Sequence, residues 1–300
     1  MCKTMNSDLK YVIIAADDLG RSRSVTQAVI EAHDRGIVTS AGMMAGGDAF
    51  QEAAQKVLER SRLSLGLHVT LCDGKAVLPH ASIPDLIDPN GFFIKSPAMM
   101  WLSFSKARVI SQVEIEVEAQ FDRLKAAGIH LSYVDSHHHL HMHPLVFEVV
   151  CRLASERGVS WIRIPHEPAP VAFSLRSRLR GAMPFIEWAV FRMLRINNMR
   201  TAEEYGLHCA TQVYGLSRTG NIDEQYLLAV LSKIADPTKD NYINEIFTHP
   251  DLSSETGISE LQALTSVAVS DRLESLGMRC VGYKEISLND NVLCAARESL

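Results

Sequence analysis

Short apolar runs alternate along this chain with longer amphipathic stretches, and this alternation restricts what the chain can fold into. Residues 11–16 (YVIIAA) predict a strand buried on both faces, and residues 24–35 predict the helix that follows it. Further strands are expected at 38–44, 63–71, 131–135, 160–164 and 242–248, and helices at 49–60, 109–127, 144–157, 222–235 and 259–276. Repeated β-α units predict an α/β fold with a parallel sheet, either open or closed into a barrel.

Length and charge restrict further which classes of protein this chain can belong to. The chain has 300 residues, 47% of them hydrophobic, and no linker, repeat or low-complexity tract. We therefore expect a single domain over residues 1–300 with a sizeable core. Lys and Arg number 30 against 35 Asp and Glu, a formal net charge of −5, so a general nucleic-acid binder is not expected.

The N-terminus and the cysteines indicate a cytoplasmic protein. The first residues lack the long apolar stretch of a signal peptide or a membrane span, since the apolar run at 11–16 leads directly into two aspartates. The six cysteines are scattered without a C-x-x-C pair. Reduced thiols are expected, and neither a disulfide framework nor a zinc-thiolate cluster is.

Unusual polar residues follow the predicted strands where each strand ends. They are Asp17 and Asp18, His68, residues 135–141, Arg163 and His249. Because the carboxyl ends of parallel strands meet at one edge, these side chains are expected to share a site, as active-site residues of (β/α) barrels do.

Two adjacent carboxylates, Asp17 and Asp18, end the first strand. One aspartate there can simply cap the next helix, but two like charges at close range need a partner cation. Successive side chains of a strand point in different directions, so one carboxylate can bind a metal while the other faces substrate.

The histidine-rich segment 137–143 (HHHLHMH) is the stronger signal for a metal. Such tracts also occur as surface metal patches, but this one begins at a strand end, after Asp135. Two imidazoles with one carboxylate leave positions open for water and substrate. We expect one divalent ion, zinc, magnesium, manganese or cobalt, although two imidazoles are unusual ligands for magnesium.

The remaining candidates have weaker individual signals. His249 is a candidate general acid, and Arg163 is a candidate partner for a free carboxylate. His68 stands inside an apolar strand, where a histidine is more often a core residue than a ligand. Asp135, His139 and His141 are expected to contact substrate.

Five motifs together resemble the YdjC-like carbohydrate deacetylases over nearly the whole chain. They are AADDLG (15–20), GIVTSAGMM (36–44), LGLHVTL (65–71), VDSHHHLHMHP (134–144) and THP (248–250). The resemblance implies a distorted, TIM-like (β/α) barrel related to polysaccharide deacetylases, with a divalent metal held by an Asp-His-His triad. Within the family, the sequence looks most like the branch associated with hopanoid biosynthesis.

Matching by motif assigns roles to individual residues. The resemblance implies that Asp18, His68 and His137 are the metal ligands and that Asp17 is the catalytic base. Arg163 and His249 match the base-orienting arginine and the acid histidine more loosely. Leu19 departs from the family pattern, where an aromatic residue is common.

A basic and apolar insertion at about 171–200 has a different composition from the rest. It holds six arginines against one acid, Glu187. Such a mixture suits peripheral contact with anionic lipid, but a barrel helix with a solvated basic face or a homodimer interface has the same pattern. With the resemblance, lipid contact implies an N-acetylglucosaminyl lipid as substrate, with the headgroup entering the metal site.

Three alternatives stay open at this point. The first is a deacetylase of soluble chitooligosaccharides such as diacetylchitobiose. The second is a non-haem Fe(II) oxygenase, which uses the same two-histidine, one-carboxylate ligand set. The third is a non-catalytic glycolipid-binding protein, although binding alone does not require Asp17 beside Asp18.

Overall fold

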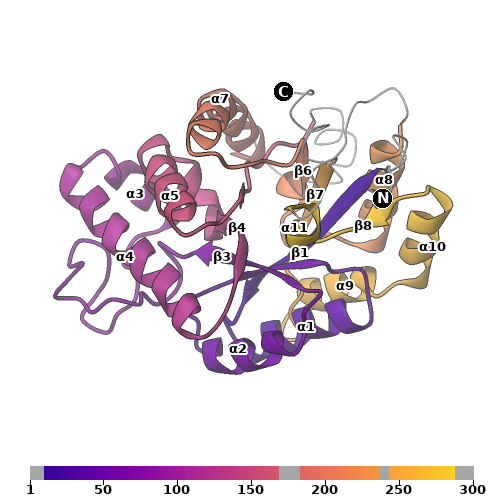
Figure 1. Ribbon diagram of the computed structural model, residues 1–300, viewed down its shortest axis with the longest axis horizontal. Coiled ribbons are helices and arrows are strands. Elements are labelled where there is room, and N and C mark those ends of the chain that lie inside the picture. Colours follow the sequence, from indigo (N-terminus) through magenta and orange to yellow (C-terminus); the bar gives the residue numbers. More distant parts are fainter. Residues whose placement is uncertain (1–9, 169–182, 237–242, 288–300) are drawn as a thin grey trace, which may run out of the picture.

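A computed structural model of the chain describes residues 10–168, 183–236 and 243–287, with the backbone alone over 183–188. The strands lie at the centre of the molecule and the helices surround them (Figure 1). Part of the basic and apolar insertion, residues 171–182, lies outside the described residues.

The strands form one parallel sheet. They are β1 (Tyr11–Leu19), β2 (Ser40–Met43), β3 (Ser64–Val69), β4 (Leu131–Ser136), β5 (Trp161–Ile162), β6 (Gln212–Tyr214), β7 (Ile243–Thr248) and β8 (Arg279–Cys280). Their order is β5-β4-β3-β2-β1-β7-β6, and β8 pairs with the beginning of β1. The central strand β1 is buried along its whole length, as its apolar sequence predicts.

The two edges of this curled sheet approach each other. Trp161 of β5 forms a parallel bridge with His208, which lies just before β6. The Ile162 amide donates to the His208 carbonyl at 2.9 Å, and the His208 amide donates to the Ser160 carbonyl at 2.8 Å. The predicted α/β fold, a distorted barrel of parallel strands, is therefore confirmed.

The helices cover the outside of the barrel, except for α11 at its amino end. They are α1 (Arg23–Asp34), α2 (Phe50–Leu58), α3 (Pro97–Ser103), α4 (Ala107–Ala126), α5 (Pro144–Glu156), α7 (Met183–Glu204), α8 (Glu224–Ile234), α9 (Glu255–Leu264), α10 (Val267–Ser275) and α11 (Tyr283–Ser287), with 3-10 segments η1 (His137–Met142) and η2 (Leu216–Arg218). Within the described part, no helix is long and apolar enough to cross a bilayer.

Most of the long segments were predicted correctly, but the 22-residue helix α7 was not among the predicted helices, and two short strands were missed. The helix expected at 259–276 is two helices, α9 and α10, because Ser266 caps a new helix by accepting from the Val269 amide. The strands β6 and β8 have only three and two residues, too few to show a periodicity.

Large aromatic side chains fill the inside of the barrel, and α11 closes its amino end. Tyr283 of α11 stacks on Tyr133 of β4 with ring centroids 4.2 Å apart. Its hydroxyl donates to Glu245 Oε2 of β7 at 2.5 Å. The indole of Trp161 donates to Ser287 Oγ at 2.9 Å. These contacts hold α11 against the amino end of the barrel.

The Tyr283 hydroxyl is expected to stabilise the fold through Glu245. Tyr283→Phe removes a donor from a buried carboxylate, so the free energy of unfolding should fall by about 1–3 kcal/mol. Tyr283→Ala also loses the stacked ring and should cost about 3–5 kcal/mol. Urea unfolding measures both changes, with the exposed neighbour Lys284→Ala as control. Equal stability of the Phe variant and the control would contradict this role.

Candidate metal centre and active site

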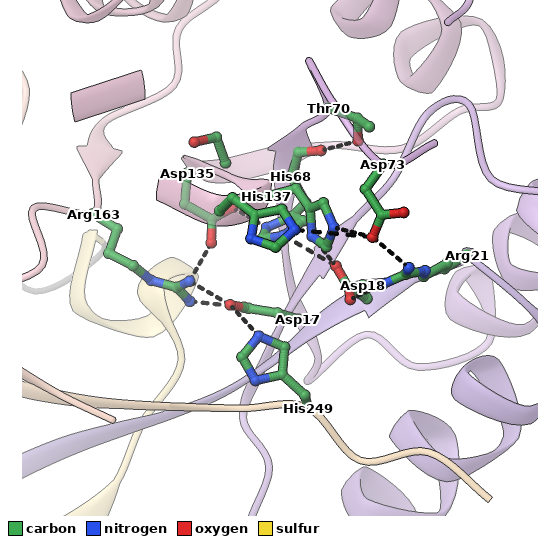
Figure 2. A network of polar contacts seen from close by, with 12 residues as sticks. Asp17, Asp18, Arg21, His68, Thr70, Asp73, Asp135, His137, Arg163 and His249 are labelled. Carbon is green, nitrogen blue, oxygen red and sulfur yellow. Dashed lines mark hydrogen bonds and ion pairs between the residues drawn. The ribbon is translucent and has the colours of Figure 1, made fainter. Parts of the chain in front are cut away.

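Asp18, His68 and His137 come together at the carboxyl ends of β1, β3 and β4. Asp18 Oδ1 lies 2.9 Å from His137 Nδ1 and 3.2 Å from His68 Nε2 (Figure 2). All three residues are buried. One carboxylate oxygen and two imidazole nitrogens thus converge on one point, an arrangement that could hold a metal ion.

A distorted backbone allows both aspartates of the pair to face the same pocket. The pairing of β1 with β2 shifts register between Ala16 and Leu19, and Asp18 adopts a left-handed conformation with φ of 62°. In a regular strand Asp17 and Asp18 would point to opposite faces. Both line the pocket here.

Backbone strain in the described residues concentrates around this pocket. The non-glycine residues with positive φ are Asp18, Asp73, His138 and His139, and all four line it. Each such conformation costs about 1–3 kcal/mol, and it persists only where the surroundings hold it in place. Strain of this kind clusters at functional sites.

The charges of the cluster stabilise one another. Burial alone would raise the pKa of Asp18, but the imidazoles of His137 and His68 outweigh it and hold that pKa well below its usual value. Burial would lower the pKa of His68, yet Asp135 and Asp17 raise it well above its usual value. The pKa of His137 is likewise raised, because Asp18 outweighs burial.

The donor atoms fit a divalent metal. Asp18 Oδ1 and His68 Nε2 are buried, and apart from the ion-pair contacts within the cluster neither makes a hydrogen bond of regular geometry. Buried polar atoms without regular hydrogen bonds are costly, so two of them aimed at one point indicate a site built for a bound group. The set of two nitrogens and one oxygen suits zinc, manganese, cobalt or iron.

His68 is fixed in one orientation by Asp135. Its Nδ1–H donates to Asp135 Oδ1 at 2.8 Å, which leaves Nε2 free to bind a metal. A carboxylate behind a ligand histidine sets its tautomer and raises its basicity. Asp135 is fully buried and does not line the pocket, so the prediction that it contacts substrate does not fit its position.

Arg163 lies inside the barrel among three carboxylates. Its two terminal nitrogens bind the oxygens of Asp17 at 2.6 and 2.9 Å. Nε donates to Glu245 Oε1 at 2.7 Å, and one terminal nitrogen also contacts Asp135. Arg163 and its three partners are buried. Burial would lower the pKa of Arg163, but the carboxylates hold it well above its usual value.

His249 faces the same carboxylate from the other side. Its Nε2 lies 3.9 Å from Asp17 Oδ2, the oxygen that Arg163 also binds (Figure 2). Its backbone amide donates to Glu260 Oε2 at 2.5 Å, which ties the loop after β7 to α9. The His249 side chain is a quarter exposed, so a ligand in the pocket can reach it.

The other histidines of the segment have separate environments. His139 is buried at the pocket wall, with the centroid of its ring 5.2 Å from the centroid of the Phe247 ring in a T-shaped arrangement. His141 is fully buried outside the pocket: it accepts from Ser136 Oγ at 2.6 Å and donates to the Arg163 carbonyl at 2.7 Å. The expected substrate contact of His141 therefore does not fit, and the residue instead fixes Arg163.

Several residues at the site were not predicted. Glu245 stands inside the apolar strand β7, and a charge in such a strand is the signal that could have found it. Asp73 and Arg21 come from loops with no such signal. Arg21 pairs with Asp73 at 2.8 Å and with Asp18 at 3.1 Å, and so neutralises charge at the pocket mouth.

The family follows from comparison with known sequences. The model of the YdjC-like protein family matches residues 11–275. The chain belongs to the YdjC-like family. It is 36% identical over 154 residues to a carbohydrate deacetylase of Brevibacillus brevis, covering 51% of this chain and 59% of that protein. A chitooligosaccharide deacetylase of Citrobacter koseri is 32% identical over 178 residues, 59% of this chain and 68% of that protein.

This chain spans about three fifths of the length of the carbohydrate deacetylases that it matches. Among solved structures, a candidate cellobiose-phosphate cleavage protein from Enterococcus faecalis superposes with a TM-score of 0.70 at 24% identity, covering 93% of this chain and 99% of that one. An uncharacterized protein from Agrobacterium tumefaciens gives a TM-score of 0.52 at 15% identity, covering 94% and 91%. These likenesses support the fold.

The hydrogen bond from His68 to Asp135 is expected to strengthen metal binding. Asp135→Asn keeps the shape of the side chain and removes its charge, so metal affinity should fall about 10–100-fold. Calorimetric titration with zinc and manganese measures the change. Asp122→Asn on the exposed face of α4 is the matched control and should bind like the parent protein. An Asp135→Asn affinity equal to that of the control would contradict the assignment.

Metal binding is also expected to weaken as the pH falls. A histidine with a raised pKa keeps its proton to higher pH, so protons compete with the metal for the ring nitrogens of His68 and His137. Affinity should rise by about tenfold per pH unit for each proton displaced. Titration calorimetry between about pH 6 and pH 8, in buffers of different ionisation enthalpy, reports both affinity and proton release. Binding that is constant with pH and releases no proton would exclude this competition.

Proposed function

We propose that this chain is a divalent-metal-dependent N-deacetylase, which hydrolyses the acetamide group of an N-acetylated amino sugar. The observation that carries the proposal is the placement of Asp17. Its carboxylate is held by Arg163, faces His249, and adjoins the cluster of Asp18, His68 and His137. The relatives named as carbohydrate and chitooligosaccharide deacetylases support the same reaction class.

In this proposal Asp18, His68 and His137 hold the metal. When bound, a divalent metal polarises an amide carbonyl and makes water more acidic. The ligand residues are all buried, so they exclude bulk water from one side of the site. Asp135 holds His68 in the tautomer that presents Nε2.

Asp17 acts as the general base. It accepts a proton from the water molecule that attacks the carbonyl carbon. Its neighbours fix the position of the carboxylate that accepts this proton. Arg163 binds both Asp17 oxygens, so the carboxylate cannot rotate. A base held in one geometry lowers the entropic cost of the reaction.

His249 acts as the general acid. It gives a proton to the nitrogen of the leaving amine, which would otherwise depart as an unstable anion. Its Nε2 faces the pocket close to Asp17, and Glu260 anchors its backbone. The proposed acid and the proposed base thus lie 3.9 Å apart in the same pocket.

The pocket suits a small polar group. Its volume is about 780 Å³, and the residues that line it include the hydroxyl side chains of Ser22, Ser217, Thr219, Ser253, Ser254 and Thr256. Hydroxyl groups can donate to and accept from sugar hydroxyls. None of the described residues that line it is a Phe, Tyr or Trp, the residues that stack on the faces of sugar rings. These features are compatible with an N-acetylglucosamine unit as ligand.

We further propose that this sugar is the headgroup of a membrane lipid, in hopanoid biosynthesis. The basic and apolar insertion at 171–200, part of which forms α7, favours a lipid-linked substrate. A soluble chitooligosaccharide is the second candidate, supported by the relatives that carry that name. Both candidates need the same catalytic residues and differ in what lies outside the pocket.

One assay distinguishes the two substrates. Metal-loaded protein is incubated with an N-acetylglucosaminyl hopanoid and, separately, with diacetylchitobiose. Replacement of an acetyl group by hydrogen lowers the product mass by about 42 Da, which mass spectrometry detects. Loss from the lipid alone supports the hopanoid substrate, and loss from the disaccharide alone supports the soluble one. Loss from neither, with the metal bound, would overturn the deacetylase proposal.

Substitution of the two adjacent aspartates should separate their roles. Asp17→Asn is expected to keep metal binding but to lower kcat by about 10²–10⁴-fold, the usual contribution of a general base. Asp18→Asn should lose metal affinity, and activity with it. Calorimetry and the deacetylation assay together measure both properties. Parent-like turnover by metal-loaded Asp17→Asn would show that Asp17 is not the base.

A further inference from the structure

Two loops that line the pocket are held by one buried carboxylate, Glu260 of α9. Its Oε1 accepts from the Ile222 amide at 3.1 Å, and its Oε2 accepts from the His249 amide at 2.5 Å. The side chain is fully buried, and no Lys or Arg of the described residues forms an ion pair with it. Burial raises the pKa of Glu260, and His249 with the two amides offsets only part of that rise. Because a carboxylate is almost never buried without a cation, its presence here indicates a specific role for the two hydrogen bonds.

The two loops form different parts of the pocket wall. The first, residues 215–222, runs from β6 to α8 and lines the pocket through Ser217 and Thr219, among others. The second, residues 249–254, runs from β7 to α9 and lines it through His249, among others. Glu260 holds the last residue of the first loop and the first residue of the second. One side chain therefore sets the position of the two loops relative to each other.

The first turn of α9 packs directly against the second loop. A Cβ atom at Gly257 would lie 2.5 Å from the Asp251 carbonyl oxygen and 2.6 Å from its amide nitrogen, so this close approach requires glycine. Ser254 caps the helix by accepting from the Gly257 amide at 3.0 Å. Glu260 follows Gly257 by three residues, so the two are neighbours on the surface of α9. The helix thus gives Glu260 a fixed place beside the loop that carries His249.

We propose that Glu260 is a positioning residue, which couples the proposed acid His249 to the loop 215–222. A substrate that seats against that loop then meets the proton donor at a fixed distance. Glu260 does not line the pocket, so it acts through the two loops and not on the substrate. The inference rests on the proposed function in one respect, the role of His249 as acid. A catalytic group misplaced by about 1 Å can cost about 10²-fold in rate, so the coupling affects catalysis directly.

Glu260→Gln tests the coupling with almost no change in shape. Both partners of Glu260 are backbone amides, which can only donate, whereas Gln offers one acceptor oxygen and one donor NH2 group. Gln can therefore hold one loop but not both. We expect kcat to fall by about 10–100-fold, and KM to rise. The assay uses metal-loaded protein with diacetylchitobiose or an N-acetylglucosaminyl hopanoid, whichever is deacetylated.

Glu116→Gln is the matched control. Glu116 of α4 is also fully buried, and its two oxygens accept from the backbone amides of Val77 and Leu78 at 2.8 and 3.0 Å. Neither of these two residues lines the pocket. Glu116→Gln should lose about as much stability as Glu260→Gln in urea unfolding, because each leaves one buried amide without an acceptor. Its kcat should stay within about twofold of the parent, since it disturbs neither loop.

Removal of the His249 side chain separates positioning from a general loss of stability. His249→Ala keeps the backbone amide, so its contact with Glu260 remains and only the proposed acid is lost. If Glu260 acts through His249, Glu260→Gln should lower kcat in the parent protein but by less than about twofold in His249→Ala protein. A residue that only stabilises the fold would lower kcat by the same factor in both.

Amide hydrogen exchange tests the same contacts without any substrate. In Glu260→Gln at least one of the amides of Ile222 and His249 loses its acceptor, so the peptide that contains it should exchange about tenfold faster. In Glu116→Gln the faster exchange should occur at Val77 and Leu78 instead. Mass spectrometry of the full-length protein measures both.

Three results would overturn the proposal. The first is equal kcat for Glu260→Gln and Glu116→Gln, and the second is an equal loss of kcat in the parent and His249→Ala backgrounds. The third is parent-like exchange of both the Ile222 and the His249 amides in Glu260→Gln. A parent protein that binds metal but deacetylates neither substrate would count against the proposed function alone. The exchange experiment would then still decide whether Glu260 couples the two loops.

Discussion

The site depends on one buried cation, the guanidinium of Arg163. It binds Asp17 of β1, Asp135 of β4 and Glu245 of β7, so it joins three strands that are distant in sequence. Taking these charges out of water is expensive, and loss of one partner from such a network typically costs about 3–5 kcal/mol. The positions of the strand ends and the positions of the proposed catalytic groups are therefore set by the same contacts. Tyr283 extends the network to α11, the helix that closes the amino end of the barrel.

The same network connects the proposed base with the proposed metal site. Asp135 contacts Arg163 with one oxygen and accepts from His68 with the other. Arg163 in turn holds Asp17, while His68 faces Asp18. A shift of Arg163 would thus move the base and loosen a ligand together. The left-handed backbone of Asp18 has a conformational free-energy cost, so the surrounding packing must hold it in place. This conformation lets the donor atoms of the site converge.

Much of this arrangement was predictable from the sequence. Buried strands of five or more residues and long amphipathic helices show clear periodicity, and the carboxyl ends of parallel strands must share an edge. The burial of Asp135 was also within reach, because alternation along β4 places it on the same face as Tyr133, inside the barrel. Glu245 was missed because one charge does not interrupt a strand pattern. His141 could not be separated from its neighbours, since only the turn of η1 decides which imidazole faces the pocket.

The segment η1 decides which histidines of the sequence 137–143 can act in the pocket. Residues 137–139 line the pocket, whereas Met142 and His143 contact α7 and α3. His138 and His139 adopt left-handed backbone conformations, which persist only where the surroundings hold them in place. The contacts of Met142 and His143 with two helices supply part of that restraint. The geometry of the pocket therefore depends on helices outside the barrel as well as on the ends of its strands.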